Sequence, residues 1–403
     1  MRIKERHIGW WLGSIMMLLL TVACASDPKE VEEDPLPKEP SVLKIYVFAP
    51  DKPIVTRADI GDVDASADEA AINTLDVWVY ENSTNEETNG KLVGHVHLSN
   101  MTWEGQKEVA IEVDDDFAQR KPNVDIYVAA NVAETNCGIS LDRNATPTVL
   151  TAASLGHKDE GGDFFGLTLP VTSVPIDGLP MSGVLTNQSV TGTAPVFTAK
   201  TQYVKLVRAV SKMRFIFSKS VSNRQDINSL SISLTGDVLP KKEYLFLDGE
   251  YPAKRSHIDA TVGYESEARE LVSGVGASDI NTSTNPASYI YDAEGETGQE
   301  YESRLNAALQ ERTENEQVIP AELSEIGRFY LRESDKQFRG TIDYKIGEES
   351  KSKPFVMNVA GDFTRNHSWI VYGYFMGSGE LVLNFYEVKA WDVQTETYPI
   401  YNW

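Results

Sequence analysis

Cysteine and positive charge are both scarce in this chain of 403 residues. It has two cysteines, and its 37 Lys and Arg residues stand against 60 Asp and Glu, a formal net charge of −23. A surface of this sign repels phosphate backbones, so we expect no nucleic-acid partner. The composition is otherwise that of a globular protein, with 41% hydrophobic and 24% charged residues, and the length predicts two or three domains.

Motifs for catalysis or metal binding are missing as well. Residues 62–73 begin like a calcium loop but lack its glycine and its final glutamate. His95 and His97 would share one strand face, but no further ligand completes a metal site. The run Asp114–Asp116 could bind a cation, although such runs more often end a strand in water. The segment around Ser182 lacks the first glycine of a nucleophile elbow. We therefore expect no enzymatic activity, no cofactor and no metal.

The N-terminus has the pattern of a bacterial lipoprotein signal. Basic residues precede an apolar stretch from Ile8 to Leu20, which is too short to span a membrane comfortably. The sequence Leu20–Cys24 resembles a lipobox, in which the cysteine receives diacylglycerol and a further acyl chain such as palmitate. We predict a signal peptide at residues 1–23 and lipid on Cys24, which anchors firmly when several chains are attached. The alternative is an ordinary secretion signal with a coincidental cysteine.

An acidic, proline-rich stretch follows at residues 24–41. It has too little apolar surface to fold, so we expect an extended tether. Its acidic run resembles the surface-export signals of some Gram-negative lipoproteins, or is simply a solvated spacer. With Cys24 lipidated, only Cys137 remains, and no intrachain disulfide can form.

Strand patterns dominate the rest of the chain. Several runs alternate apolar and polar side chains, which is the period of a strand with one buried face. The clearest runs are 42–48, 75–80, 109–113, 124–130, 203–217, 230–234, 340–346, 368–375 and 381–388. A helix is expected at Glu300–Arg312, and a shorter one at Ala65–Ala71. The pattern predicts an all-β fold with two antiparallel β-sandwich domains, residues 42–200 and 201–403, joined near Thr198–Gln202.

A set of segments in both halves of the chain carries a family resemblance. They are Thr56-Arg57-Ala58 ahead of Ile72–Tyr80, Asp125–Asn131, Leu179–Gly183, Val204–Phe215, Phe329–Ser334, Phe363–Phe375, Leu381–Trp391 and Tyr398–Trp403. In this order, and after a lipobox, they resemble the fimbrillin family, the subunits of lipoprotein-derived type V pili of certain Gram-negative anaerobes. The resemblance implies two tandem transthyretin-like sandwiches and a precursor held at the outer membrane by its lipid.

The resemblance also implies a maturation scheme. A trypsin-like, Arg-specific protease would cut after Arg57, leave Ala58 as the new N-terminus and remove the first strand. The C-terminal extension of another subunit would then fill the groove. The expected donor residues are Leu381, Leu383, Val388, Tyr398 and Ile400. Arg57 lies in a predicted loop, where nicking concentrates, whereas Arg208 and Arg365 lie inside strand patterns.

The residues of the first strand make physical sense of this scheme. In Val42–Phe48, the side chains of Leu43, Ile45 and Val47 would fill one side of a sheet. Removing the strand would leave unpaired backbone groups and an apolar slot, which a donor strand repairs by β-augmentation.

These expectations describe a non-enzymatic subunit of a surface pilus, or fimbria, that supports adhesion and biofilm formation. Its partners would be other pilus subunits, the processing protease, the outer membrane before processing, and an unidentified host or bacterial receptor. The acidic region Glu294–Glu316 leaves a stalk, anchor or tip position open. The alternative function is a glycan-binding outer-membrane lipoprotein, and a lipoprotein hydrolase is the third. The sugar platforms of the glycan-binding alternative would be Trp78, Trp103, Trp369, Trp391 and Trp403, most of which lie in strand patterns typical of core residues.

Overall fold

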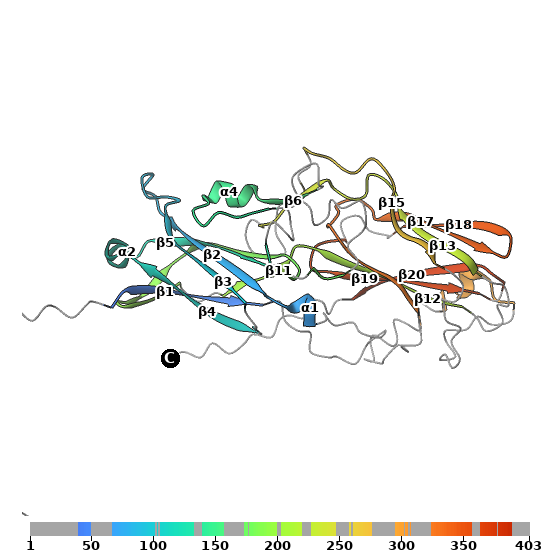
Figure 1. The fold of residues 1–403 in the computed structure, drawn as a ribbon, viewed down its shortest axis with the longest axis horizontal. Helices are drawn as coiled ribbons and strands as arrows, with labels where there is room; N and C mark the ends of the chain where they lie inside the picture. Colours follow the sequence, from blue (N-terminus) through green and yellow to red (C-terminus); the bar gives the residue numbers. More distant parts are fainter. Residues whose placement is uncertain are drawn as a thin grey trace, which may run out of the picture. The chain divides into compact units, whose positions relative to one another are not determined.

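Strands dominate the computed structural model, which confirms the all-β expectation (Figure 1). It describes residues 39–49, 67–100, 103, 105–132, 139–156, 173–175, 177–199, 203–219, 227–246, 258, 261–275, 295–301, 303–304, 307, 324–356, 363–376 and 378–388. From Pro40 onward these residues belong to one compact unit. The predicted sites Cys24, Arg57, Ala58, Tyr398 and Ile400 lie outside the described residues, as do the signal peptide and most of the tether.

Two sheets come from the first half of the chain. One contains β1 (Ser41–Phe48), β4 (Gln106–Val113), β8 (Val190–Thr193), β9 (Val196–Ala199) and β10 (Val204–Lys205). The other has the order β11 (Val207–Arg208), β7 (Met181–Gln188), β5 (Asn123–Ala130), β2 (Thr74–Asn82) and β3 (Leu92–Ser99). Their inward side chains form one apolar core that includes Leu43, Val77 and Ile126. This pair of sheets is the first sandwich.

Two further sheets form the second sandwich. One has the order β16 (Ser324–Leu331), β12 (Ser211–Lys219), β19 (Ser368–Phe375) and β20 (Leu381–Val388). The other has the order β15 (Arg269–Val275), β13 (Ile227–Leu234), β17 (Arg339–Ile346) and β18 (Glu349–Val356). A separate core that includes Phe215, Ile232 and Val371 lies between them.

Short elements connect and cover these sheets. They are α1 (Ala67–Ala70), α2 (Asp115–Arg120), α4 (Pro147–Ala152), β6 (Ser154–Gly156) and β14 (Lys242–Tyr244). Because β6 pairs with β14, a two-stranded ladder joins a segment between β5 and β7 to one between β13 and β15. The acidic run at Asp114 begins α2: the Asp114 carboxylate accepts a hydrogen bond from the backbone N–H of Phe117 at 2.7 Å.

The pairing is mostly antiparallel, as predicted, with three parallel exceptions. β1 is parallel to β9 and to β10, and β12 is parallel to β19. In each case the chain leaves one sheet and returns to it later, so no tight turn connects the paired strands. Strand alternation shows a strand's own buried face but not its neighbours, which is why the sequence does not predict these pairs.

The predicted strand 203–217 is divided among three sheets. Residues 204–205 pair in the sheet of β1, residues 207–208 pair with β7, and β12 belongs to the second sandwich. The buried doublets Leu206-Val207 and Ala209-Val210 interrupt the alternation at these changes. The chain therefore passes between the sandwiches at Ala209 and Val210 rather than at residue 200. We keep two domains as a proposal, with their boundary moved to this point.

Helical structure also appears in the acidic region before β16. Residues 298–301, 303–304 and 307 are helical. This helix begins two residues before the start predicted from the sequence, Glu300. Thr297 and Glu300 form a capping box, in which the Glu300 carboxylate accepts the Thr297 N–H at 2.9 Å. Among the described residues, no helix has the length and apolar content to cross a membrane.

Candidate functional site

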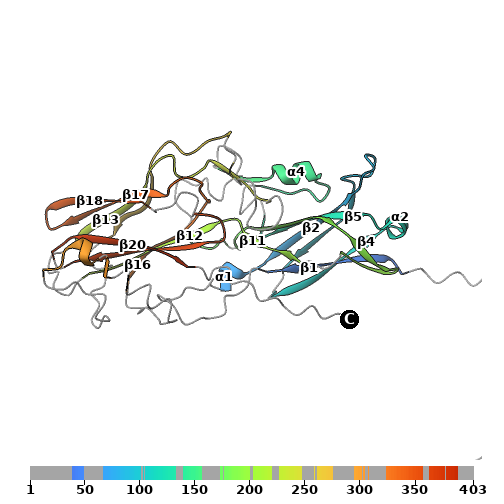
Figure 2. The same ribbon diagram turned by 180° about the vertical axis from the view of Figure 1, so that it is seen from behind.

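The first strand, β1, lies in the interior of its sheet rather than at an edge. It pairs with β4 along its whole length, from Ser41 opposite Val113 to Phe48 opposite Gln106. On its other side its start pairs with β9 and its end with β10. Both views of the fold show β1 beside β4 (Figures 1 and 2). Removal of β1 would therefore separate β4 from β9 and β10 and leave backbone groups unpaired on both sides.

Alternate side chains of β1 fill the core of the first sandwich. Leu43, Ile45 and Val47 are at most 1% exposed, which confirms the predicted inward face. Burial of three such side chains contributes about 5–9 kcal/mol of gross hydrophobic free energy. Because this contribution comes from one continuous segment of eight residues, a single replacement strand of the same alternation could supply it.

The outward face of β1 is half-exposed and mixes the polar Lys44 and Tyr46 with the apolar Val42 and Phe48. The Lys44 ammonium lies 2.8 Å from the Glu108 carboxylate on β4, and this hydrogen bond raises the pKa of Lys44. Partial burial raises the pKa of the neighbouring Tyr46 phenol. At the end of the strand the Phe48 and Tyr203 rings are 4.1 Å apart. These contacts fix which face of the strand points inward.

Helix α1 is the first described element after β1, and a buried polar cluster holds it. Glu69 accepts a hydrogen bond from Lys212 on β12 at 2.9 Å and another from the Tyr330 hydroxyl on β16. The Arg208 guanidinium donates to the backbone carbonyl of Glu69 at 3.0 Å. All four side chains are at most 1% exposed. We call Glu69, Arg208, Lys212 and Tyr330 the α1 cluster.

Burial and charge oppose each other within the α1 cluster. Burial works against ionisation of Glu69, yet the Lys212 ammonium and its hydrogen bond hold the pKa of that carboxyl below its usual value. Burial lowers the pKa of Lys212 to about 8 although Glu69 attracts its proton. Burial, with Glu69 close by, raises the pKa of the Tyr330 phenol. The Lys212 ammonium and its hydrogen bond therefore favour the ionised form of Glu69 in spite of its burial.

Arg208 and Arg365 are buried, as the sequence predicts for residues that a protease cannot reach. Both are 0% exposed. Arg208 donates to the side chain of Asn366 at 3.1 Å. Arg365 donates to the carbonyls of Tyr244 and Leu245 at 2.7 and 3.0 Å. These guanidinium groups thus use their N–H donors on backbone carbonyls and on the Asn366 side chain.

Glu243 is a second buried acid, beside Arg365. It is 0% exposed, and it accepts the backbone N–H of Glu333 at 3.2 Å. Its other oxygen lies 3.9 Å from Arg365, too far for a hydrogen bond. Burial raises the pKa of Glu243 to about 8. The positive charge of Arg365 opposes this rise, and the negative charge of Glu333 adds to it.

Three of the predicted donor residues lie within the chain's own second sandwich. β20 pairs with β19 from residue 381 to residue 388. Leu381 and Leu383 are 1% and 7% exposed and belong to the second core, and Val388 ends the ladder opposite Ser368. In the single chain these three residues are engaged, so the donor prediction depends on the residues that follow β20.

Three of the five tryptophans that could serve as sugar platforms are core residues. Trp78, Trp103 and Trp369 are at most 9% exposed. Trp78 also donates from its indole N–H to the carbonyl of Asp142 at 3.1 Å. Trp391 and Trp403 lie outside the described residues. The described tryptophans therefore give the glycan-binding alternative no exposed ring.

The two histidines considered as metal ligands make side-chain contacts within the fold. His95 and His97 both contact one carboxylate oxygen of Asp76, each at 2.9 Å. Within the described ranges, no group of three or more His, Cys, Asp or Glu side chains is placed to hold a metal ion. At the turn before β19, Asn366 has a φ of 62° and its N–H donates to the carbonyl of Val210 at 2.7 Å.

Sequence reasoning missed the α1 cluster. Glu69, Lys212 and Tyr330 come from elements far apart in the chain, so no local spacing connects them. In β12 the residues Met213 and Phe215 alternate with Lys212, so the sequence suggests that Lys212 faces solvent, and only its burial shows that it needs a partner. The sequence alone does not identify that partner.

Comparisons with known proteins support the fold. No family model matches the sequence, and no curated protein matches it. The crystal structure of a candidate cell adhesion protein from Parabacteroides distasonis is similar, with a TM-score of 0.50 and 13% identity over 86% of this chain and 96% of that one. A fimbrial assembly protein from the same species has a TM-score of 0.42 and 13% identity, covering 86% and 99% of the two chains. The chain therefore shares its all-β sandwich fold with the first of these proteins.

Proposed function

We propose that this chain is a structural subunit of a cell-surface pilus that assembles by protease-triggered donor-strand exchange and supports adhesion and biofilm formation. The observation that carries the proposal is the position of β1, which is inserted between β4 and the pair β9 and β10 while it supplies three core side chains. The candidate cell adhesion protein of similar fold agrees with a role at the cell surface.

Cleavage after Arg57 would cut the covalent link between β1 and the rest of the sandwich. From that moment only hydrogen bonds and apolar contacts would hold β1. Its departure would open a slot in which a strand of another subunit restores both ladders and the three inward side chains. Exchange then needs no chemical energy beyond the cleavage, because the incoming strand replaces the contacts that the outgoing strand loses.

The α1 cluster gives the processed chain a fixed beginning. Glu69 stands twelve positions after Arg57, and its bonds to Lys212 and Tyr330 do not involve β1. Loss of β1 would therefore leave α1 attached to β12 and β16. The new N-terminus at Ala58 would extend from this anchored helix.

The donor segment in this proposal is the chain end after β20. Its contact residues would include Tyr398 and Ile400, while Leu381, Leu383 and Val388 would hold the base of the segment in its own sandwich. Before processing, the lipid on Cys24 and the tether at residues 24–41 would place the precursor at the outer membrane. The Arg-specific protease and neighbouring pilus subunits would be its partners.

Trypsin treatment of the purified precursor tests the proposal. We expect a new N-terminus at Ala58 together with SDS-resistant ladders of subunits. Arg57→Gln should prevent both, whereas Arg143→Gln, which removes an exposed arginine from another loop, should leave both unchanged. Complete cleavage after Arg57 that yields only monomers would contradict the mechanism, and so would ladders formed by the Arg57→Gln variant.

A truncation tests the donor assignment separately. Deletion of Tyr398–Trp403 should leave the thermal unfolding of the precursor unchanged but stop its incorporation into fibres. Mixed with the full chain after cleavage, the truncated subunit should shorten the ladders, because it can accept a strand but cannot donate one. Fibres of normal length from the truncated subunit alone would refute these donor residues.

A further inference from the structure

The place of β1 between β4 and the pair β9 and β10, which we call the β1 slot, has a charged outer side. On β4 the side chains that face the same way as Lys44 are all exposed: Gln106, Glu108, Ala110 and Glu112. On the opposite wall, Val196 and Thr198 of β9 are uncharged, and Lys205 of β10 stands opposite Phe48. On this side β4 therefore presents two carboxylates and no cation to the strand beside it.

One of these carboxylates has its partners on β1. The Lys44 ammonium lies 2.8 Å from the Glu108 carboxylate, and the Tyr46 phenol donates a hydrogen bond to the same group. Lys44 stands opposite Ala110, so it reaches Glu108 along the diagonal, as long side chains do between neighbouring strands. In the described part of the chain, both partners of this carboxylate belong to β1. Departure of β1 would therefore leave Glu108 without them.

A ring contact fixes the register of the strand in the β1 slot. The Phe48 ring lies 4.1 Å from the ring of Tyr203, which is 43% exposed. Phe48 comes four residues after Lys44 and faces the same outward side, while the alternate side chains between them point into the core. A strand that reproduces these contacts has a basic residue at the place of Lys44, an aromatic residue four positions later and aliphatic residues at the inward positions.

We propose that Glu108 is a specificity residue of the β1 slot, which prefers a donor strand with Lys or Arg at the place of Lys44. This inference rests on the strand exchange proposed above. An exposed ion pair adds little stability by itself. However, a donor with an acid at this place would face Glu108 on β4, with Glu112 on the same side, and like charges repel. Glu108 thus acts on the difference between donors, which is what determines specificity.

The residues that follow Lys389 do not offer this cation. Residues 390–403 include Asp392 and Glu396 but no Lys or Arg. A second copy of this chain that donates these residues would therefore leave Glu108 without a positive partner. The preferred donor is a subunit of different sequence, and a second copy is a weaker donor.

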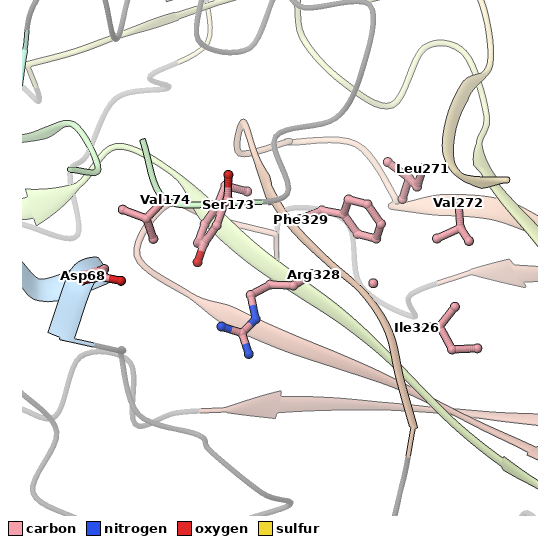
Figure 3. Close-up of a pocket in the computed structure, with 10 residues that line it drawn as sticks. Asp68, Ser173, Val174, Leu271, Val272, Ile326, Arg328 and Phe329 are labelled. Atoms are coloured by element: carbon pink, nitrogen blue, oxygen red, sulfur yellow. The ribbon is translucent and has the colours of Figure 1, made fainter. Parts of the chain in front are cut away.

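The cavity beside α1 lies outside the β1 slot. It has a volume of about 630 Å³, and its lining comes from α1, from residues 173–174, from β15 and from β16. Figure 3 shows Asp68, Arg328 and Phe329 among the lining residues. Of the described residues that line it, none belongs to β1, β4, β9 or β10. Donor selection therefore does not involve this cavity.

Peptide exchange on the trypsin-cleaved precursor tests the selection. After trypsin has been inhibited, an equal mixture of two peptides is added, one with residues 39–49 and one with the same residues and Lys44→Glu. Mass spectrometry of the purified complex gives the ratio of the peptides that have replaced β1. We expect the original peptide to exceed the Lys44→Glu peptide by about threefold to tenfold.

Variants of the precursor separate Glu108 from the general charge of β4. In Glu108→Lys the preference should reverse, because the acid of the Lys44→Glu peptide then meets a cation. Glu112→Lys makes the same change in charge on the same side of β4 and should keep the original preference. Thermal unfolding verifies that each precursor is folded. If Glu108→Lys is not, Glu108→Gln provides the test and should bring the ratio close to one.

The outcomes distinguish this inference from the strand exchange on which it rests. Replacement of β1 by neither peptide would contradict strand exchange and the inference together. Equal replacement by both peptides would leave strand exchange standing and overturn the role of Glu108. So would a preference that folded Glu108→Lys or Glu108→Gln leaves unchanged, or one that Glu112→Lys also reverses.

Discussion

Glu69 and Lys212 are 143 positions apart in the chain, yet the carboxylate of one lies 2.8 Å from the ammonium of the other. Neither side chain has more than 1% of its surface exposed. The Tyr330 hydroxyl donates to the same carboxylate. The pair thus joins α1, the first described element after β1, to β12, the first strand of the second sandwich.

Removing one partner of this pair should destabilise the chain strongly. We expect Glu69→Gln or Lys212→Met to lower the free energy of unfolding by about 3–5 kcal/mol, because each leaves the other group buried without its counter-charge. The double variant should lose less than the sum of the single variants. Urea unfolding of the four proteins measures the coupling, and single variants within about 0.5 kcal/mol of the original chain, as for ordinary surface changes, would contradict it.

Glu243 should make the folded chain less stable as the pH rises, which is the opposite of the usual effect of a carboxyl group whose pKa is lowered on folding. Its folded pKa of about 8 exceeds the ordinary value of 4.5, so the folded chain holds a proton that the unfolded chain releases. Its contribution to stability is complete below about pH 4.5 and declines as the pH rises to about 8. The melting temperature of the original chain minus that of Glu243→Gln should therefore fall between pH 5 and pH 8.

An exposed acid supplies the control for this titration. Glu267→Gln removes a carboxylate from the surface, and its difference from the original chain should vary much less over the same range. A difference for Glu243→Gln that is flat, or that rises with pH, would show that Glu243 is ionised in the folded chain.

Truncation of an inward side chain of β1 should destabilise the precursor. Ile45→Ala should lower its free energy of unfolding by about 2–5 kcal/mol, since it leaves a cavity in the first core. Lys44→Ala changes the outward neighbour and should have a much smaller effect. Urea unfolding of the three precursors measures the difference, and equal stability of Ile45→Ala and Lys44→Ala would contradict the inward position of Ile45.

Gly183 should not tolerate a side chain. A Cβ at this position would lie 2.5 Å from the carbonyl oxygen of Lys205 and 2.6 Å from a methyl group of Val204. Both contacts require β7 and β10 to move apart, so Gly183→Ala should cost about 1–3 kcal/mol. Thr186→Ala, at an exposed position of the same strand, is the control in the same denaturation experiment. Equal stability of the two variants would contradict the close approach.

Local alternation predicts the strands because it reports which side of each strand is buried. In β4, Val109, Ile111 and Val113 point into the core while Glu112 is exposed, as the sequence indicates. The same alternation identifies the inward side chains of β1. It does not identify which strands are neighbours, and the parallel pairs of β1 with β9 and β10 therefore became visible only in the structure.

Other features were missed for different physical reasons. The capping box of Thr297 and Glu300 was readable in the sequence and would have placed the helix start correctly. The partner of Lys212 was not readable, because a contact across 143 positions depends on how the sandwiches fold. The cavity near Arg328 likewise needs α1 and β16 to meet, which no pattern within either element reveals.

The burial of three arginines determines where an Arg-specific protease can cut a folded subunit and where it can cut a misfolded one. Arg208, Arg332 and Arg365 are at most 1% exposed, so an Arg-specific protease cannot reach these bonds in the folded precursor. In a misfolded precursor the same bonds are open to attack. In the proposed maturation, an Arg-specific protease would leave these three bonds intact in a folded subunit and cut them in a misfolded one.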